Sequence, residues 1–334
     1  MAYTTIDNPE LYFQVKLWSG TGSSLALTFD GSEDMQPDLI WGKGRSLAGY
    51  NHGIVDSVRG VQKNIYSNLT DAEEDYSTGV TAFGSDGFTV GTGNVFNNSS
   101  QTYVAWCWKE SATAGFDIDS NSGTGSARTE AHSLSAVPHV IFMKSTNDTT
   151  NWAVYHHKNT SAPETDYLRL NDTRATADDA ERWNDTAPTS SVFSVGTDSE
   201  TNSSGNSYIT YLWSEKQGFS KFGSYIGNGV VDDGPFIYTG FRPAFVLCKR
   251  TDSTSSGAWV LWDNKRNPFN ASENYLVVDT SGAEGSSGTS IDMLSNGFKP
   301  YDTGACNISG GTFIYMAFAE APFVNSNGVP CNAR

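Results

Sequence analysis

Apolar residues along this chain fall in short runs separated by polar turns. Three of these runs read PDLIWGK, PHVIFMK and PAFVLCK, at residues 37–43, 138–144 and 243–249. Continuous apolar runs, rather than alternating ones, are typical of strands buried on both faces. A proline at the first position of such a strand removes no hydrogen-bond donor from the sheet. No long stretch shows the 3.6-residue period of an amphipathic helix, so the pattern predicts many strands and few helices.

A second apolar phrase recurs at a fixed spacing along the chain. Its three copies are SSQTYVAWCWKE (99–110), SGNSYITYLWSE (204–215) and SGGTFIYMAFAE (309–320). Tyr103, Tyr208 and Phe313 occupy the same place in the three copies and are 105 residues apart. A fixed period of this kind indicates that the chain is built from repeated structural units.

The repeat divides the chain into three units, residues 1–112, 113–219 and 220–334, which we call unit 1, unit 2 and unit 3. Each unit holds several short apolar runs bounded by Gly, Ser, Asn and Asp. Strands separated by turn signals at intervals of about 8–12 residues are typical of an antiparallel sandwich. We therefore predict an all-β protein of three tandem β-sandwich repeats, concanavalin-like or jelly-roll-like. The repeat pattern leaves open whether a strand of one unit completes its neighbour.

Two charged positions survive in all three copies of the repeat. They are Lys43, Lys144 and Lys249 at the end of the PxhhhhK-type strand, and Glu110, Glu215 and Glu320 at the end of the aromatic strand. An active site is seldom repeated three times in one chain, so a structural role is the better interpretation. We expect the lysine and glutamate of each unit to form a partly exposed pair at one rim of the sandwich.

An Asp-x-x-Arg pair also recurs, in units 1 and 3 only. Its members are Asp56 with Arg59 and Asp263 with Arg266, whereas unit 2 has His156 and Asn159 at these places. A spacing of three does not put two side chains on one face of a strand. We predict a structural ion pair at a corner between a strand and a turn.

The sequence carries none of the common catalytic or metal-binding motifs. There is no nucleophile elbow, phosphate-binding loop, dinucleotide fingerprint or zinc-type Cys/His cluster. DIDSNSG (117–123) resembles the start of a calcium loop, but position twelve is Arg128 rather than a glutamate. We predict no catalytic residue, cofactor or metal, although carboxylates from separate strands could still meet. Whether Cys306 and Cys331 form a disulfide is left open.

The formal net charge of −16 argues against nucleic acid and against anionic membranes as partners. No run of 18 apolar residues is present, so no membrane span is expected. The N-terminal residues lack a basic region followed by an apolar core, and we expect no secretory signal.

The run QPDLIWGK…DSVRG…SNLTDAE…AFGSDGFTVG…TYVAWCWK resembles an uncharacterised repeat domain of virion structural proteins from marine tailed phages, such as cyanophages. The opening AYTTIDNP…YFQ is similar to the openings of such proteins. The resemblance is close in unit 1 and looser in units 2 and 3, and unit 2 lacks both the Asp-x-x-Arg pair and the SDGF turn. It implies a tail fibre, appendage or head decoration built on a lectin-like sandwich, and it carries over no catalytic residues.

From this resemblance we expect a virion surface protein that assembles in the host cytoplasm and contacts other virion proteins. A homo-oligomer is expected, with a trimer favoured because fibres and many head appendages of such viruses are trimeric. A cell-surface carbohydrate is a candidate partner. Two alternatives stay open: a carbohydrate-active enzyme on a lectin-like sandwich, and a non-viral secreted adhesin.

Overall fold

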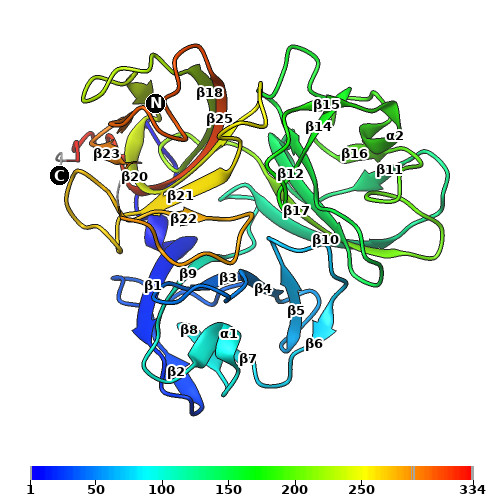
Figure 1. Ribbon diagram of the computed structural model, residues 1–334, viewed down its shortest axis with the longest axis horizontal. Helices are drawn as coiled ribbons and strands as arrows, with labels where there is room; N and C mark the ends of the chain where they lie inside the picture. The colour runs from blue at the N-terminus through cyan, green and yellow to red at the C-terminus, as the bar shows by residue number, and fades with distance from the viewer. Residues whose placement is uncertain (1, 287, 289, 332–334) are drawn as a thin grey trace.

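The computed structural model describes residues 2–286, 288 and 290–331 (Figure 1). Antiparallel strands make up nearly all of the regular structure. The helices of the described residues are single short turns: a 3₁₀ helix at Pro9–Leu11, α1 (Asn94–Asn97) and α2 (Ala180–Trp183). The prediction of an all-β protein with few helices is confirmed.

Unit 1 forms one large and one small sheet. The large sheet has the spatial order β1 (Phe13–Ser19), β9 (Thr102–Trp108), β3 (Leu39–Gly44), β4 (Gly53–Asp56), β5 (Lys63–Tyr66) and β6 (Glu74–Asp75). The small sheet has the order β2 (Leu25–Leu27), β8 (Gly87–Val90) and β7 (Val80–Gly84). The aromatic strand β9 lies between β1 and β3, so both of its edges are hydrogen-bonded.

Units 2 and 3 repeat this arrangement. In unit 2 the large sheet is β10 (Phe116–Ser122), β17 (Ser207–Trp213), β12 (Val140–Ser145), β13 (Ala153–His156), β14 (Asp166–Arg169) and β15 (Ala177–Asp178), and the small sheet is β11 (Arg128–Ala131) and β16 (Val192–Val195). In unit 3 the large sheet is β18 (Ser220–Ile226), β25 (Thr312–Pro322), β20 (Phe241–Arg250), β21 (Trp259–Asp263) and β22 (Leu276–Val277). The small sheet of unit 3 is β19 (Ile237–Tyr238), β24 (Gly297–Pro300) and β23 (Ile291–Leu294). Among the described residues, every sheet takes its strands from one unit, so no strand is exchanged between units.

The aromatic strand is apolar throughout because both of its faces are buried. In β9, Trp106 and Trp108 point to a core that all three units share. Tyr103 and Cys107, on the opposite face, pack in a separate core with residues of the small sheet and α1. Alternate residues of a strand point to opposite faces, so two cores require an uninterrupted apolar run. Each large sheet is thus one layer of a sandwich and also one wall of the shared core.

Figure 1 shows the three units as three lobes around this shared core, with unit 1 at the bottom, unit 2 on the right and unit 3 at the upper left. The ring of Trp108 lies 6.3 Å from Trp213 of unit 2 and 5.6 Å from Phe245 of unit 3, measured between ring centroids. Phe142 of unit 2 and Trp259 of unit 3 are 6.3 Å apart. Consecutive units therefore do not form an open row but close around a common centre.

The contact between unit 3 and unit 1 closes the ring without a peptide link. Phe13 of β1 stacks on Phe318 of β25, with ring centroids 5.3 Å apart. The N-terminal residues then cross onto the junction of units 2 and 3, where Thr4 Oγ1 donates to the carbonyl oxygen of Gln217 at 2.7 Å. The N-terminus thus ties unit 1 to the chain segment that joins the other two units.

Candidate functional sites at the seams between units

We call the three unit-to-unit contacts seam 1–2, seam 2–3 and seam 3–1. The repeated lysines and glutamates lie at opposite ends of these seams. Lys43 is opposite Val104 in the register of β3 and β9, and Glu110 follows Val104 by six residues. At about 3.3 Å per residue this is a separation of about 20 Å along the strand. The other two units repeat the register, with Lys144 opposite Ile209, Lys249 opposite Ile314, and Glu215 and Glu320 six residues further on. The predicted lysine–glutamate pair is therefore wrong, because the ends of neighbouring antiparallel strands lie at opposite rims.

The three lysines are also buried rather than partly exposed. Lys43, Lys144 and Lys249 each have an exposed fraction of 0%. Lys43 Nζ and Lys144 Nζ each donate to the carbonyl oxygen of the following residue at 2.8 Å. Lys249 Nζ donates across seam 2–3 to the carbonyl oxygen of Arg174 at 2.9 Å. Burial lowers the pKa of each lysine from 10.5 to about 8. The sequence marked these positions but did not indicate that the side chains are buried.

Glu110 and Glu215 lie against the first strand of the following unit. At seam 2–3, Glu215 forms an ion pair with Lys221 at 2.8 Å and accepts a hydrogen bond from the backbone N–H of Phe222 at 2.8 Å. At seam 1–2, Glu110 has the same position and is hydrogen-bonded to Asp117 of β10. Glu110 and Glu215 therefore each join two units, whereas Glu320 forms an ion pair with Arg242 of its own unit. None of the three has the predicted lysine as its partner.

The carboxyl pair of Glu110 and Asp117 is the arrangement that most resembles acid–base machinery. Burial and then the hydrogen bond with Asp117 raise the pKa of Glu110 to about 7. Asp117 is also fixed by the backbone N–H of Ser133, which donates to Oδ2 at 2.7 Å. The two carboxyl groups of a glycosidase stand about 5 Å or more apart, with the sugar between them. A directly hydrogen-bonded pair leaves no such space, so we interpret it as a seam contact that retains a proton.

The predicted ion pairs at the strand–turn corners are confirmed. Arg59 Nε lies 2.6 Å from Asp56 Oδ2, and Arg266 Nε lies 2.5 Å from Asp263 Oδ2. Both aspartate side chains and the Arg266 side chain have an exposed fraction of 0%. Backbone N–H groups of Arg59 and Arg266 also donate to these aspartates, each at 2.8 Å. The spacing of three lets one turn satisfy a buried carboxylate from both backbone and side chain.

These corners also hold the seams, through partners that the sequence did not indicate. At seam 1–2, Tyr211 Oη donates to Asp56 Oδ2 at 2.7 Å. At seam 3–1, Trp106 Nε1 donates to Asp263 Oδ2 at 2.9 Å. At seam 2–3, His156 Nε2 lies 3.2 Å from the carbonyl oxygen of Tyr315. The partners are between 155 and 159 residues apart. No local pattern reports a contact over such a separation. The repeat period was the one available signal, since it places Trp106 and Tyr211 at equivalent positions of successive units and His156 at the position of Asp56 and Asp263.

Backbone hydrogen bonds also join the units, with one equivalent bond at each of the three seams. They link Glu73 N to Thr146 O at 2.8 Å, Thr176 N to Thr251 O at 2.9 Å, and Glu284 N to Arg45 O at 2.9 Å. Each bond joins one unit to the next, and the third returns from unit 3 to unit 1. The ring is therefore held at all three seams by equivalent contacts.

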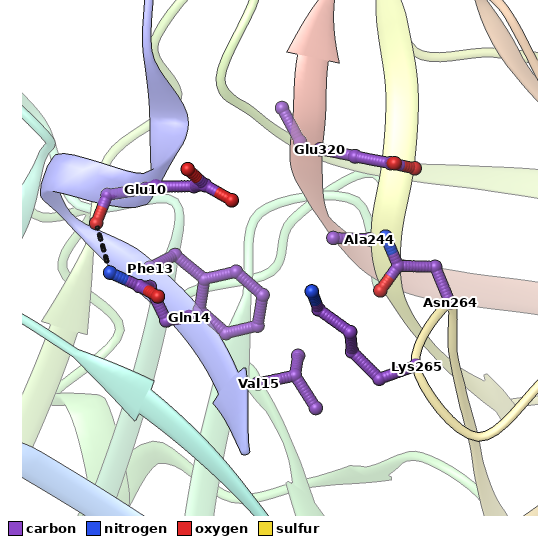
Figure 2. A pocket seen from close by; sticks show the side chains of 9 residues that line it. Glu10, Phe13, Gln14, Val15, Ala244, Asn264, Lys265 and Glu320 are labelled. Carbon is purple, nitrogen blue, oxygen red and sulfur yellow. Dashed lines mark hydrogen bonds between the residues drawn. The ribbon is translucent and has the colours of Figure 1, made fainter. Parts of the chain in front are cut away.

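Seam 3–1 contains a small cavity of about 50 Å³. Figure 2 shows the labelled side chains around it, among them Glu10, Gln14, Asn264, Lys265 and Glu320. Gln14 Nε2 donates to the carbonyl oxygen of Glu10 at 3.0 Å, and Glu320 forms an ion pair with Arg242 at 3.1 Å. This is the space open to the centres of water molecules, and because each water needs about 10–15 Å³ on this measure, the cavity holds a few of them. It is too small for an organic ligand.

Seam 2–3 carries a larger, open groove of about 340 Å³. We call it the Tyr3–Tyr238 groove, and its lining residues are Tyr3, Glu215, Gln217, Gly218, Ser220, Lys221, Tyr238, Thr239 and Gly240. They come from the N-terminal segment, the linker between β17 and β18 with the first two residues of β18, and the end of β19 with the turn that follows it. Its volume lies at the lower end of the range of small-molecule sites, about 300–1,000 Å³.

Two histidines fill the same seam beside Glu215. The rings of His139 and His157 meet edge to face with centroids 4.4 Å apart. The backbone N–H of Glu215 donates to His139 Nδ1 at 3.0 Å, and His157 Nε2 lies 2.6 Å from the carbonyl oxygen of Phe222. Burial, reinforced by His157, lowers the pKa of His139 to about 4. Both rings are packing and hydrogen-bonding groups of the seam in their neutral form.

The four cysteines are free thiols. Cys306 and Cys331, whose pairing the sequence left open, do not form a disulfide. Cys306 instead lies near Cys248, since Tyr225 Oη contacts both the sulfur of Cys248 at 3.7 Å and the carbonyl oxygen of Cys306 at 2.8 Å.

Two further results concern only the part of the chain that the structure describes. In residues 2–286, 288 and 290–331, no three His, Cys, Asp or Glu side chains are grouped so as to hold a metal ion. DIDSNSG forms most of strand β10 and its end rather than a calcium loop. None of the described helices has the length and apolar character that crossing a membrane requires.

Comparison with known proteins gives one match. No curated protein and no solved structure matches this chain. One family model, described as a domain of unknown function, matches residues 8–322. This range contains the large sheets of all three units, so the family model covers the whole ring rather than a single repeat. The match spans most of the chain, and the protein therefore belongs to the DUF7483 family, a domain of unknown function.

Proposed function

We propose that this protein is a non-catalytic structural component of the surface of a phage virion. The observation that carries the proposal is the closed ring of three sandwiches. Two of the ionisable residues that recur in the repeat hold seams: Asp56 accepts a hydrogen bond from Tyr211 of unit 2, and Glu215 forms an ion pair with Lys221 of unit 3. A continuous core with hydrogen-bonded seams gives a stiff body, which suits a particle exposed to the environment.

The resemblance of unit 1 to virion proteins of marine tailed phages supports the same proposal. The four free thiols agree with assembly in a reducing host cytoplasm. The net charge of −16 favours solubility and weak affinity for nucleic acid during assembly. The proposal covers a tail fibre, an appendage and a head decoration.

The proposed partners are other virion proteins, further copies of this chain and a cell-surface carbohydrate. A trimer is favoured, since closed cyclic assemblies are the rule for homo-oligomers. Light scattering on the purified protein should then give three times the 36.1 kDa mass of the chain. A 36.1 kDa species both in solution and after release from particles would reject the trimer.

The direct test is detection in particles. Virions of a phage that encodes this chain should be purified on a density gradient, and the chain should be quantified by mass spectrometry against the major capsid protein. We expect a fixed copy number per particle and surface labelling by antibodies in electron microscopy. A chain that is abundant in the lysate but absent from purified particles would reject the proposal. Release of reducing sugar from host polysaccharide would instead favour the alternative of a carbohydrate-active enzyme.

A further inference from the structure

We propose that the Tyr3–Tyr238 groove binds a neutral saccharide of one to two sugar rings. This inference rests on the proposed function, because it gives a surface protein of the particle a defined contact with glycans. It assigns the contact to one seam of the ring and to named residues.

The first argument is the exposed aromatic surface. Tyr238 is 53% exposed although it belongs to a strand, and its ring borders the groove. Its hydroxyl lies 3.2 Å from that of Tyr3, which holds the two phenol groups together. The face of a pyranose ring carries C–H groups that pack on an aromatic ring, while its hydroxyls stay hydrogen-bonded. An amphipathic tyrosine at a wet surface offers both kinds of contact.

The second argument is the pairing of charges in the groove. Glu215 supplies acceptors and Lys221 supplies donors, and their ion pair of 2.8 Å fixes them side by side. A sugar with neighbouring hydroxyls offers a donor and an acceptor at a similar spacing. The two charges cancel locally, and the chain as a whole carries −16. The surrounding field therefore disfavours sulfated and uronate glycans and leaves neutral ones.

The third argument is the rigidity of the walls. Tyr3 Oη donates to the carbonyl oxygen of Gly240 at 2.7 Å, and Thr4 Oγ1 donates to that of Gln217 at 2.7 Å. Gly218 has a φ of +79°, and a Cβ placed there would lie 2.8 Å from Thr4 Cβ. The groove is therefore formed before a ligand arrives, which reduces the entropy lost on binding. Tyr3 and Thr4 come from the single N-terminal segment, so the other seams cannot repeat this wall.

The test uses the full chain on a glycan array. The array carries neutral hexose, N-acetylhexosamine and 6-deoxyhexose oligosaccharides beside sulfated and uronate ones. Hits are measured again by calorimetry with the free oligosaccharide. The variants are Tyr238→Ala, which removes the stacking ring, and Tyr238→Phe, which keeps it. Phe269→Ala is the matched control, because Phe269 is an aromatic residue 77% exposed outside the groove. Each variant must keep the melting temperature of the parent.

We expect binding to neutral oligosaccharides that weakens about tenfold or more in Tyr238→Ala, the loss typical of a central aromatic contact. Tyr238→Phe and Phe269→Ala should bind within about threefold of the parent, since the stacking face is intact in both. Neutral binding that Tyr238→Ala leaves unchanged, a preference for anionic glycans, or no binding on the array would each overturn the inference. None of these results bears on the presence of the chain in purified particles, so the two proposals fail separately.

Discussion

The buried corner of unit 3 gives the sharpest test of how the ring is held. Asp263 accepts hydrogen bonds from Arg266 Nε at 2.5 Å and from Trp106 Nε1 of unit 1 at 2.9 Å. Its side chain has an exposed fraction of 0%. The change Asp263→Asn keeps the shape of the side chain and removes its charge. Arg266 then keeps one carboxylate, Glu284 at 3.0 Å.

The expected loss of unfolding free energy is about 3 kcal/mol. Breaking a buried ion pair by removing one partner costs about 3–5 kcal/mol, because the other charge stays buried. The contact with Glu284 places the value at the lower end of this range. If the new asparagine side chain turns its NH₂ group toward Trp106, the indole N–H is left without an acceptor. This adds up to about 1 kcal/mol to the loss of unfolding free energy.

Urea unfolding followed by circular dichroism measures the change, since the fluorescence of Trp106 would itself respond to the mutation. Asp252→Asn is the control, because Asp252 forms an ion pair with Arg250 at 2.9 Å and is 37% exposed. An exposed pair contributes about 1 kcal/mol or less. The double variant Asp263→Asn/Arg266→Met should recover much of the loss, since it leaves no buried charge unpaired.

A loss below about 1 kcal/mol for Asp263→Asn, equal to that of the control, would refute the reasoning. It would show that water or relaxation compensates the arginine. A double variant less stable than the single one would also contradict the argument, since it would mean that the guanidinium is favourable without its carboxylate.

Three further predictions concern stability. Burial lowers the pKa of His139 to about 4 and of His156 to about 3, so below pH 6.5 the unfolded chain binds protons that the folded chain excludes. The melting temperature should therefore fall as the pH is lowered from about 6.5 to 4, and it should fall less steeply in a His139→Phe variant. A melting temperature that stays constant over this range would contradict the prediction. The three buried lysines have a pKa of about 8 when folded and 10.5 when unfolded, so stability should rise from about pH 8 to 10. The denaturant concentration at the midpoint of unfolding should rise over this pH range in the parent protein. It should stay constant in a variant in which all three lysines are changed to methionine. A rise that persists in this variant would show that the lysines do not cause it. Trp108 is 2% exposed and packs among rings of all three units. The variant Trp108→Ala should lower the free energy of unfolding, measured in urea, by about 3–5 kcal/mol. A loss under about 1 kcal/mol would argue against a shared core.

Features that depend on neighbours along one strand could be read from the sequence. Continuous apolar runs such as that around Trp106 predicted strands buried on both faces, and the two cores on either side of β9 explain why. The turn that joins Asp56 to Arg59 is equally local, because both residues belong to one corner. Such features are set by backbone geometry over a few residues.

The pairing of the repeated charges could not be read in this way. Lys43 and Glu110 recur together with their strands, which made them appear to be partners, yet antiparallel pairing places them at opposite rims. Glu110 and Glu215 instead meet the following unit, as Glu215 meets Lys221. The groove beside this pair has the N-terminal segment as one of its walls. These contacts join segments that only folding brings together.

The sequence by itself determined the all-β class, the three-fold repetition and the corner ion pairs, because each is written in local spacing or in a fixed period. The tertiary structure decided that the units close into a ring, that the repeated lysines are buried, and that Trp106 and Tyr211 bind carboxylates of another unit. The physical reason is that a repeat fixes what each unit contains but not which surfaces face one another. That choice follows from the total apolar area that three sheets bury when they share one core.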